Sequence, residues 1–436
     1  MTELARGLTR LNATAMVTGT IIGASIFVQP SEIARLLDSP RSIMSAWVAC
    51  GVLTLFGAFV CAELASAFPQ TGGIYVFLRQ AFSPLAGFLW GWAMFWSVHS
   101  GIIAAIAVVF GRYAVVLLPA SFQSDATIRA LAVAVILGLS VLNYAGVRGG
   151  GRVQTVLTIV KVSAIALLVV CGFLFAPELV SAPPAELPDR AGNPFVLAMV
   201  AGLFAYGGWH MVTYTAGETT MPARTIPTAL VVGVAIVTIC YVFVNLVYLR
   251  VLPLETVRTS TRIAADAADA IFGRGGEVVL SILVLVSTFG SLTGIILTGP
   301  RMYFSMARDG LAPQLLGKIH TRYQTPAAAI AAQALWASVL AATGAYRTLF
   351  TRVVYTEWLF FALLAAGLFV LRCRDDYRPA YRTWGYPAVP AVFIAASLAV
   401  VLHQFMADPF EAVFGLGIVA AGVPVYYFRH ANRRLS

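Results

Sequence analysis

Two glycine-containing segments carry the residues best placed to bind a small molecule in this sequence. Residues 19–27 read Gly-Thr-Ile-Ile-Gly-Ala-Ser-Ile-Phe and residues 204–209 read Phe-Ala-Tyr-Gly-Gly-Trp, and each lies within a long apolar run. Residues of poor helix propensity weaken a helix at such positions. Glycine-interrupted helices at corresponding places in two halves of a membrane protein indicate a transporter's substrate site. Close helix packing through small residues is the alternative for either segment alone, but the pair favours a substrate site.

A lysine within an apolar run is the most informative single residue. Lys161 lies about eight residues into its run, which is roughly 12 Å along a helix at 1.5 Å per residue. A lysine at the centre of a membrane costs several kcal/mol. Snorkelling of the ammonium to the inner interface is the alternative, but it is strained at this depth. We therefore expect a functional cation here.

The remaining ionisable groups give weaker signals. Glu63, Glu218 and Glu357 stand near the ends of apolar runs, and we interpret them as interfacial charges paired with loop arginines. His99 is expected to be a hydrogen-bonded core residue, whereas His210 follows the second interruption directly and could face the site. No run contains a chain of carboxylates of the kind that a proton relay uses.

Several function classes are disfavoured. The sequence contains no nucleophile–base pair, phosphate-binding loop or metal-ligand spacing among its five cysteines. We therefore expect no metal, no cofactor and no enzyme. The arginines are scattered and do not form the basic stripe of a nucleic-acid-binding protein. A membrane-embedded enzyme or a receptor remains the alternative from a different class, but neither convergent catalytic groups nor a soluble domain can be found.

The composition of the chain indicates which kind of secondary structure contains these residues. The chain has 436 residues, of which 59% are hydrophobic and 11% charged, and its mean hydropathy is +0.84. Soluble domains carry about 25% charged residues, so this is an all-α polytopic membrane protein. With roughly 20 apolar residues needed per span, we predict twelve transmembrane helices, at residues 12–36, 42–67, 84–118, 126–145, 153–176, 195–217, 226–251, 277–305, 326–344, 351–371, 386–406 and 409–428.

The basic residues give an orientation. Most of the 29 arginines and lysines fall in loops on the side that holds both termini. Cytoplasmic loops are enriched in such residues, so both termini are predicted to be cytoplasmic.

An ordered series of motifs resembles the amino acid–polyamine–organocation superfamily, and within it the L-type amino acid transporter branch. The motifs span essentially the whole chain: Gly23-Ala-Ser-Ile-Phe27, Glu63 with Pro69-Gln-Thr-Gly-Gly-Ile-Tyr75, Phe204-Ala-Tyr-Gly-Gly-Trp209, Glu218 with Met221-Pro-Ala-Arg-Thr-Ile-Pro227, Ser287-Thr-Phe-Gly-Ser291, Arg301, and Arg308-Asp-Gly310.

The resemblance implies a five-plus-five inverted-repeat (LeuT-like) fold in one transmembrane domain covering residues 1–436. Residues 12–176 would form the first repeat (spans 1–5) and residues 195–371 the second (spans 6–10). Residues 386–428 would add two C-terminal helices (spans 11–12).

The resemblance also implies how an amino acid is held. N–H groups at the half-helix of residues 24–27 would meet its carboxylate, and unwound carbonyls would meet its amine. Phe204 would be an aromatic gate that closes over the substrate. The implied substrate-binding residues are Ile21, Gly23, Ala24, Ser25, Ile26, Phe27, Phe204, Ala205, Tyr206, Gly207, His210 and Tyr241. For His210 and Tyr241, a packing role remains open.

In sodium-independent members of the superfamily, a lysine at the position of Lys161 occupies the place of a sodium ion. By this resemblance its ammonium would link span 1 to span 8, with the Gly23 carbonyl and Ser287 as contacts.

Departures from the family pattern bear on substrate and partners. The usual Gly-Ser-Gly is Gly23-Ala24-Ser25 here, His210 replaces a frequent Asn, and Thr293 occupies another position often held by Asn. The added bulk favours small neutral amino acids, although the smaller Thr293 could admit larger ones. Residues 119–125 contain no cysteine, so no disulfide-linked heavy subunit is expected.

We therefore predict a secondary transporter of neutral L-amino acids, surrounded by lipid in the bacterial cell (inner) membrane and working by sodium-independent exchange. A proton- or sodium-coupled symporter on the same fold is the alternative.

Overall fold

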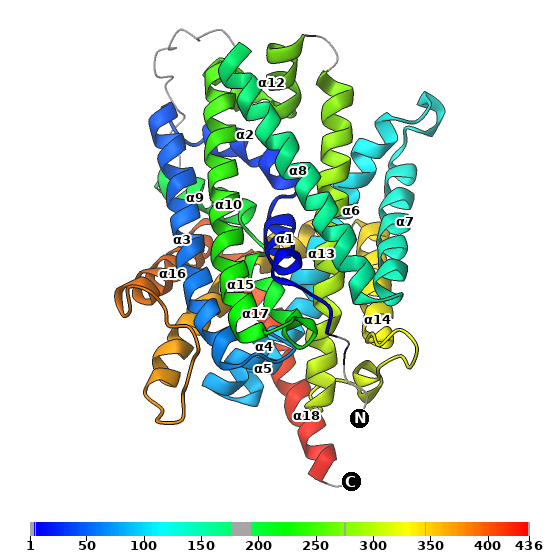
Figure 1. The fold of residues 1–436 in the computed structure, drawn as a ribbon, viewed down its shortest axis with the longest axis vertical. Helices are drawn as coiled ribbons and strands as arrows, with labels where there is room; N and C mark the ends of the chain where they lie inside the picture. The colour runs from blue at the N-terminus through cyan, green and yellow to red at the C-terminus, as the bar shows by residue number, and fades with distance from the viewer. Residues whose placement is uncertain (1–3, 5, 176–192, 274–275, 345, 435–436) are drawn as a thin grey trace.

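The structure is a computed structural model that describes residue 4 and residues 6–175, 193–273, 276–344 and 346–434. Within these ranges the chain is almost entirely helical, and the one extended pairing is an isolated parallel bridge between Leu8 and Thr219. Figure 1 shows long helices packed side by side as a bundle.

The elements up to the end of the fifth predicted span are α1 (Arg10–Ile21), η1 (Ala24–Phe27), α2 (Gln29–Ala34), α3 (Pro40–Ala67), α4 (Ile74–Ala81), α5 (Pro84–Ala93), the π-helical η2 (Met94–Val98), α6 (His99–Val116), η3 (Ala120–Phe122), α7 (Asp125–Tyr144) and α8 (Val147–Phe175).

The elements that follow are α9 (Pro194–Ala205), η4 (Trp209–Glu218), α10 (Pro222–Val251), α11 (Leu254–Thr259), α12 (Ile263–Phe272), α13 (Gly276–Arg308), η5 (Gln314–Gly317), α14 (Ala327–Thr343), α15 (Tyr346–Arg372), α16 (Ala388–Ala407), α17 (Pro409–Ala420) and α18 (Gly422–Arg434).

Local sequence explains where several helices begin. Ser39, Ser83 and Ser124 precede α3, α5 and α7, and the side-chain oxygen of each accepts a hydrogen bond from the backbone N–H three residues later. This is the usual N-cap arrangement. Pro40 and Pro84 occupy the first helical position, where the missing N–H has no cost.

Ten helical segments are long and apolar enough to cross a membrane, which confirms a multi-pass, all-α membrane protein. Two predicted spans are not among these ten. Residues 12–36 are divided into α1, η1 and α2, and the helix within residues 326–344 is α14, with 17 residues. The count of twelve and the inverted repeat therefore remain predictions, and residue 176, the predicted end of the first repeat, lies outside the described residues.

The structure also contains elements that the sequence analysis did not predict. The third predicted span, residues 84–118, is not one continuous α-helix, because the five-residue π-helical η2 interrupts it. Two short helices, α11 and α12, lie between α10 and α13.

Helix α1 lies near the middle of the bundle and packs against α8, α10 and α13 (Figure 1). Gly19 allows the contact with α8, because a Cβ at this position would lie 2.2 Å from Gln154 Nε2 and 2.2 Å from Thr158 Oγ1. The end of α1 is consequently held at the centre of the protein.

Candidate functional site

Two helices stop inside the bundle, as the glycine-containing segments predict. Helix α1 ends at Ile21, and the backbone is extended before η1 begins. Helix α9 ends at Ala205, and Gly208 takes φ +95° before η4 begins. Only glycine adopts this left-handed conformation without strain. The two interruptions leave helix-terminal N–H and C=O groups near one another in the interior.

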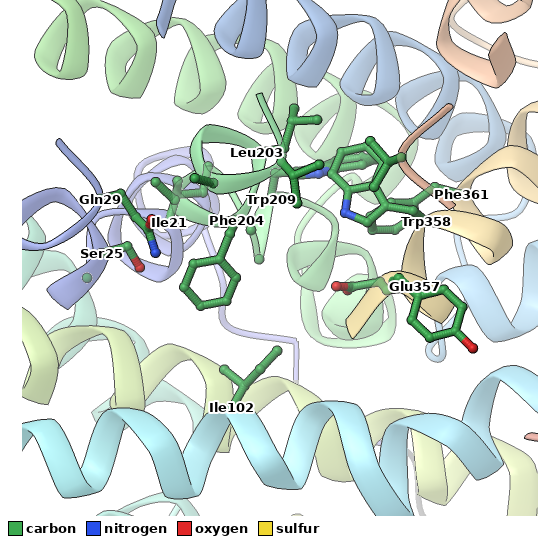
Figure 2. A pocket seen from close by; sticks show the side chains of 18 of the residues that line it. Ile21, Ser25, Gln29, Ile102, Leu203, Phe204, Trp209, Glu357, Trp358 and Phe361 are labelled. Carbon is green, nitrogen blue, oxygen red and sulfur yellow. The ribbon is translucent and has the colours of Figure 1, made fainter. Parts of the chain in front are cut away.

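A cavity of about 460 Å³ adjoins both interruptions, which lies within the size range of small-molecule sites. Figure 2 shows Ile21 and Ser25 at one end, Glu357 at the other, and the Phe204 ring projecting between them. Six predicted site residues line this cavity: Ile21, Gly23, Ser25, Phe204, Ala205 and Gly207.

The other six predicted site residues do not line it. They are Ala24, Ile26, Phe27, Tyr206, His210 and Tyr241, and all are buried in the packing around the cavity. For Ala24–Phe27 the expectation concerned backbone N–H groups, which remain a prediction. For Tyr206, His210 and Tyr241 the structure places the side chain behind the cavity wall.

The cavity extends toward one end of the bundle. Its lining continues along Leu197 and Val200 of α9 and along His403 and Ala407 of α16. The first of these helices begins there and the second ends there. In the predicted topology both ends are on the outer side, and the cavity would then be directed outward.

Ion pairs lie toward the opposite end of the bundle. The guanidinium of Arg301 donates to the Glu218 carboxylate through Nε (2.8 Å) and Nη2 (3.2 Å). Its Nη1 donates to Asn143 Oδ1 at 2.9 Å. Arg301 and Glu218 are completely buried. This network connects α13, η4 and α7.

A second pair links α3 to α15. Arg372 donates to both oxygens of Glu63 at 2.9 and 2.6 Å, and the backbone N–H of Thr383 donates to Glu63 Oε2. The prediction that Glu63 and Glu218 pair with arginines is confirmed. The expected loop position of these arginines is wrong, because Arg301 and Arg372 lie on helices α13 and α15, and both carboxylates are fully buried in the protein.

A third contact holds the short helix α4. Arg79 forms an ion pair with Asp309, and the Tyr75 hydroxyl donates to the same carboxylate at 2.7 Å. Burial, together with this hydrogen bond, raises the pKa of Tyr75. The tyrosine therefore stays a neutral donor at physiological pH.

Lys161 is fully buried on α8, and its ammonium points toward the interrupted end of α1. Its Nζ donates to the carbonyls of Ile22 (2.7 Å), Gly19 (2.8 Å) and Ser287 (3.2 Å), and it lies 3.4 Å from Ser291 Oγ. A cation at a helix C-terminus meets its unpaired carbonyls and the negative end of the helix dipole.

The geometry refines the predicted contacts of this lysine. The α1 carbonyls that it reaches are those of Gly19 and Ile22, and the predicted contact with the Gly23 carbonyl is wrong, because that oxygen instead accepts from Ser287 Oγ at 3.4 Å. The lysine joins span 1 to span 8, as predicted. An ammonium buried in this way does not snorkel to an aqueous surface.

Tyr241 connects the two interruptions from behind the cavity. Its hydroxyl lies 3.0 Å from the carbonyl oxygen of Ile21 and 3.1 Å from that of Ala205. One belongs to the end of α1 and the other to the end of α9. The residue thus holds the relative position of the segments that line the cavity.

Glu357 is the site residue that the sequence analysis placed wrongly. It does not lie at an interface: it lines the cavity wall, and its carboxylate points toward Phe204 (Figure 2). A carboxylate within a predicted span is itself a signal of function, and that signal was available in residues 351–371.

His210 lies directly behind Glu357, with Nε2 3.7 Å from Glu357 Oε1. Aromatic rings surround the imidazole at centroid distances of 5.2 to 5.7 Å: Trp90, Trp209, Tyr214 and Phe361. His99 is a core residue, as predicted, and its Nε2 lies 3.0 Å from the Ile295 carbonyl oxygen.

Comparisons with known proteins give one consistent result. A sequence model of the amino acid permease family matches residues 8–421. The chain is 31% identical to the human cystine/glutamate transporter, covering 98% of this chain and 85% of the relative. It is 31% identical to the rabbit large neutral amino acids transporter small subunit 2 (96% and 79%). It is also 31% identical to the serine/threonine exchanger SteT of Bacillus subtilis (strain 168) (96% and 95%).

Proposed function

The chain belongs to the amino acid permease family, and we propose that it exchanges neutral L-amino acids across the bacterial cytoplasmic membrane by alternating access, without sodium. The predicted superfamily and its L-type branch are confirmed, and the protein is an amino acid transporter rather than an enzyme. The specific substrates, the absence of coupling and the membrane are parts of the proposal.

The cavity at the two helix interruptions is the observation that carries the proposal. An amino acid presents a carboxylate and an ammonium in every case, and interrupted helices offer N–H groups to the first and carbonyls to the second. Gly23 and Ser25 line the cavity at the start of η1, and Phe204 and Ala205 line it at the end of α9. The mainly apolar remainder suits a neutral side chain.

The contacts of Lys161 support independence from sodium. Carbonyl oxygens at the end of a broken helix are the ligands that sodium takes in coupled transporters of this kind. Here the carbonyl oxygens of Gly19 and Ile22 already accept hydrogen bonds from the Lys161 ammonium. A sodium ion at this place would meet both the ammonium charge and occupied oxygens.

The asymmetry of the two ends supports alternating access. The cavity extends toward the predicted outer side, and the ion pairs of Glu63, Glu218 and Asp309 lie toward the other end. Phe204 projects into the cavity between Ser25 and Glu357 (Figure 2), where a ring could cover a bound amino acid. We assign it as the gate.

Proton-coupled symport is the second candidate, because Glu357 and His210 form a buried pair of titratable groups at the cavity wall. A partner subunit linked by a disulfide is not part of the proposal. No cysteine occurs in the loop of residues 119–125 where such a bridge would form.

Counterflow with the purified full-length protein in liposomes tests the proposal. We expect uptake of labelled alanine only when unlabelled amino acid is enclosed, with equal rates in sodium and potassium buffers. Accumulation driven by a sodium gradient in vesicles without internal amino acid would contradict exchange. Accumulation driven by a proton gradient would favour the second candidate.

A further inference from the structure

Glu357 places a carboxylate in a mostly apolar cavity wall, in which Tyr355, His403 and Gln404 are further polar side chains. Trp358 and Phe361 are its neighbours in the lining (Figure 2). The Glu357 side chain is 10% exposed, and its nearest ionisable partner is His210 at 3.7 Å. This distance is too long for a hydrogen bond. In the part of the chain that the structure describes, no group donates a hydrogen bond to this carboxylate.

A carboxylate in this position requires a hydrogen-bond donor. Burying a charged group is costly unless it is paired and hydrogen-bonded, and buried polar groups in proteins are almost always hydrogen-bonded. The carboxylate faces the cavity (Figure 2), and His210 lies behind it. The missing donor is therefore best supplied by whatever occupies the cavity.

We propose that Glu357 determines specificity by accepting a hydrogen bond from the side chain of the transported amino acid. The substrate class is an amino acid with a hydrogen-bond donor on its side chain: a hydroxyl among the neutral amino acids of the proposed function, or an ammonium, which extends that function to cationic amino acids. This inference rests on the proposed function, because the carboxylate and amine of the substrate must be held at the interruptions for its side chain to reach Glu357. His210 acts as a positioning residue: its ring, enclosed by aromatic side chains, holds the carboxylate toward the cavity.

The expected discrimination is substantial. A site built to bind a substrate hydroxyl rejects the analogue that lacks it, because the buried group is then left unpaired. Hydrogen bonds to charged groups are the stronger class, so we expect the donor-bearing member of a matched pair to compete about 10- to 100-fold better. Serine against alanine and ornithine against norleucine are suitable pairs, one for each kind of donor.

Competition against labelled alanine in exchange tests this proposal, with the parent protein, Glu357→Met and Glu357→Gln. Methionine removes the hydrogen-bond acceptor, so the competition ratios of serine to alanine and of ornithine to norleucine should both fall to about one. Glutamine keeps an acceptor but loses the charge, so it should keep part of the serine preference and lose that for ornithine. Glu255→Gln is the matched control, because this exposed carboxylate on α11 is not part of the cavity lining, and its two ratios should equal those of the parent.

Ratios near one in the parent protein would overturn the proposal, as would undiminished ratios in Glu357→Met. The proposal would also be overturned if both variants lost alanine and serine exchange equally and showed an altered pH profile. Glu357 would then bind a proton rather than the side chain of the substrate. If Glu357→Met does not fold, Glu357→Gln and the parent ratios decide. Failure of the parent to exchange alanine at all would instead count against the proposed function.

Discussion

Replacing Lys161 with methionine should slow exchange about tenfold or more while leaving the protein folded. Methionine keeps most of the length and the apolar contacts of the side chain but removes the charge and all three donors. The carbonyls of Gly19 and Ile22 would then lose their hydrogen bonds to the ammonium. The interrupted end of α1 would no longer be tied to α8.

The size of the effect follows from these two short bonds. A hydrogen bond to a charged group contributes about 1.5–3 kcal/mol after exchange with water. Because burial of the ammonium is itself costly, we take about 1–3 kcal/mol as the free energy with which the two bonds together hold the end of α1. A change of this size alters a conformational equilibrium about 5- to 150-fold. Global stability should change little, because the lost bonds and the relieved desolvation oppose each other.

The assay is homoexchange of labelled alanine in liposomes, normalised to reconstituted protein, with thermal unfolding as the measure of folding. Lys318→Met is the matched control, because Lys318 is the other lysine of the chain and lies exposed after η5. It should exchange at the parent rate. Parent-like exchange by Lys161→Met, still indifferent to sodium, would refute the role assigned to this lysine.

Other perturbations test the remaining parts of the site. Phe204→Ala should lower the turnover of exchange more than the amount of folded protein, and parent-like turnover would remove the gate from this position. Tyr241→Phe removes a hydroxyl that contacts two carbonyls. At about 1 kcal/mol per hydrogen bond, the rate of exchange should fall about fivefold, and an unchanged rate would show that exchange does not need this link between α1 and α9. Glu218→Gln leaves the buried Arg301 without its carboxylate, which should cost about 3–5 kcal/mol of stability; the melting temperature should fall, and Glu218→Leu combined with Arg301→Met should recover part of it. Small amino acids such as alanine, serine or glycine should displace label better than tryptophan, and stronger displacement by tryptophan would show that the cavity does not limit substrate size.

Signals local in sequence predicted a large part of this molecule. The membrane class follows from composition, and the two helix interruptions follow from Gly23 and from Gly207-Gly208 within apolar runs. Lys161 stood out because an ammonium inside a membrane requires a specific partner. Each of these inferences needs only the residue and its neighbours along the chain.

Contacts between distant elements could not be predicted in the same way. A uniformly apolar helix gives little sign of its rotation about its own axis, so the sequence does not tell whether Glu357 faces lipid, a loop arginine or a cavity. Its approach to His210 joins α15 to η4, and the two residues are 147 positions apart in the chain. The π-helical η2 was missed because nothing in residues 94–98 distinguishes it from α-helix.

The contacts around the cavity support the proposed exchange mechanism. The Lys161 ammonium already donates to a carbonyl at the end of α1, so in the proposed mechanism no ion has to bind before the helix is held. Opening the other end of the bundle requires the buried pair of Arg301 and Glu218 to separate or move together. A ligand shifts such an equilibrium only through contacts that differ between the two states. In the proposed mechanism no coupling ion binds, so those contacts would come from the amino acid bound at the two helix interruptions. A transporter of this kind changes between its outward-facing and inward-facing states faster with an amino acid bound than without one. This property defines an exchanger.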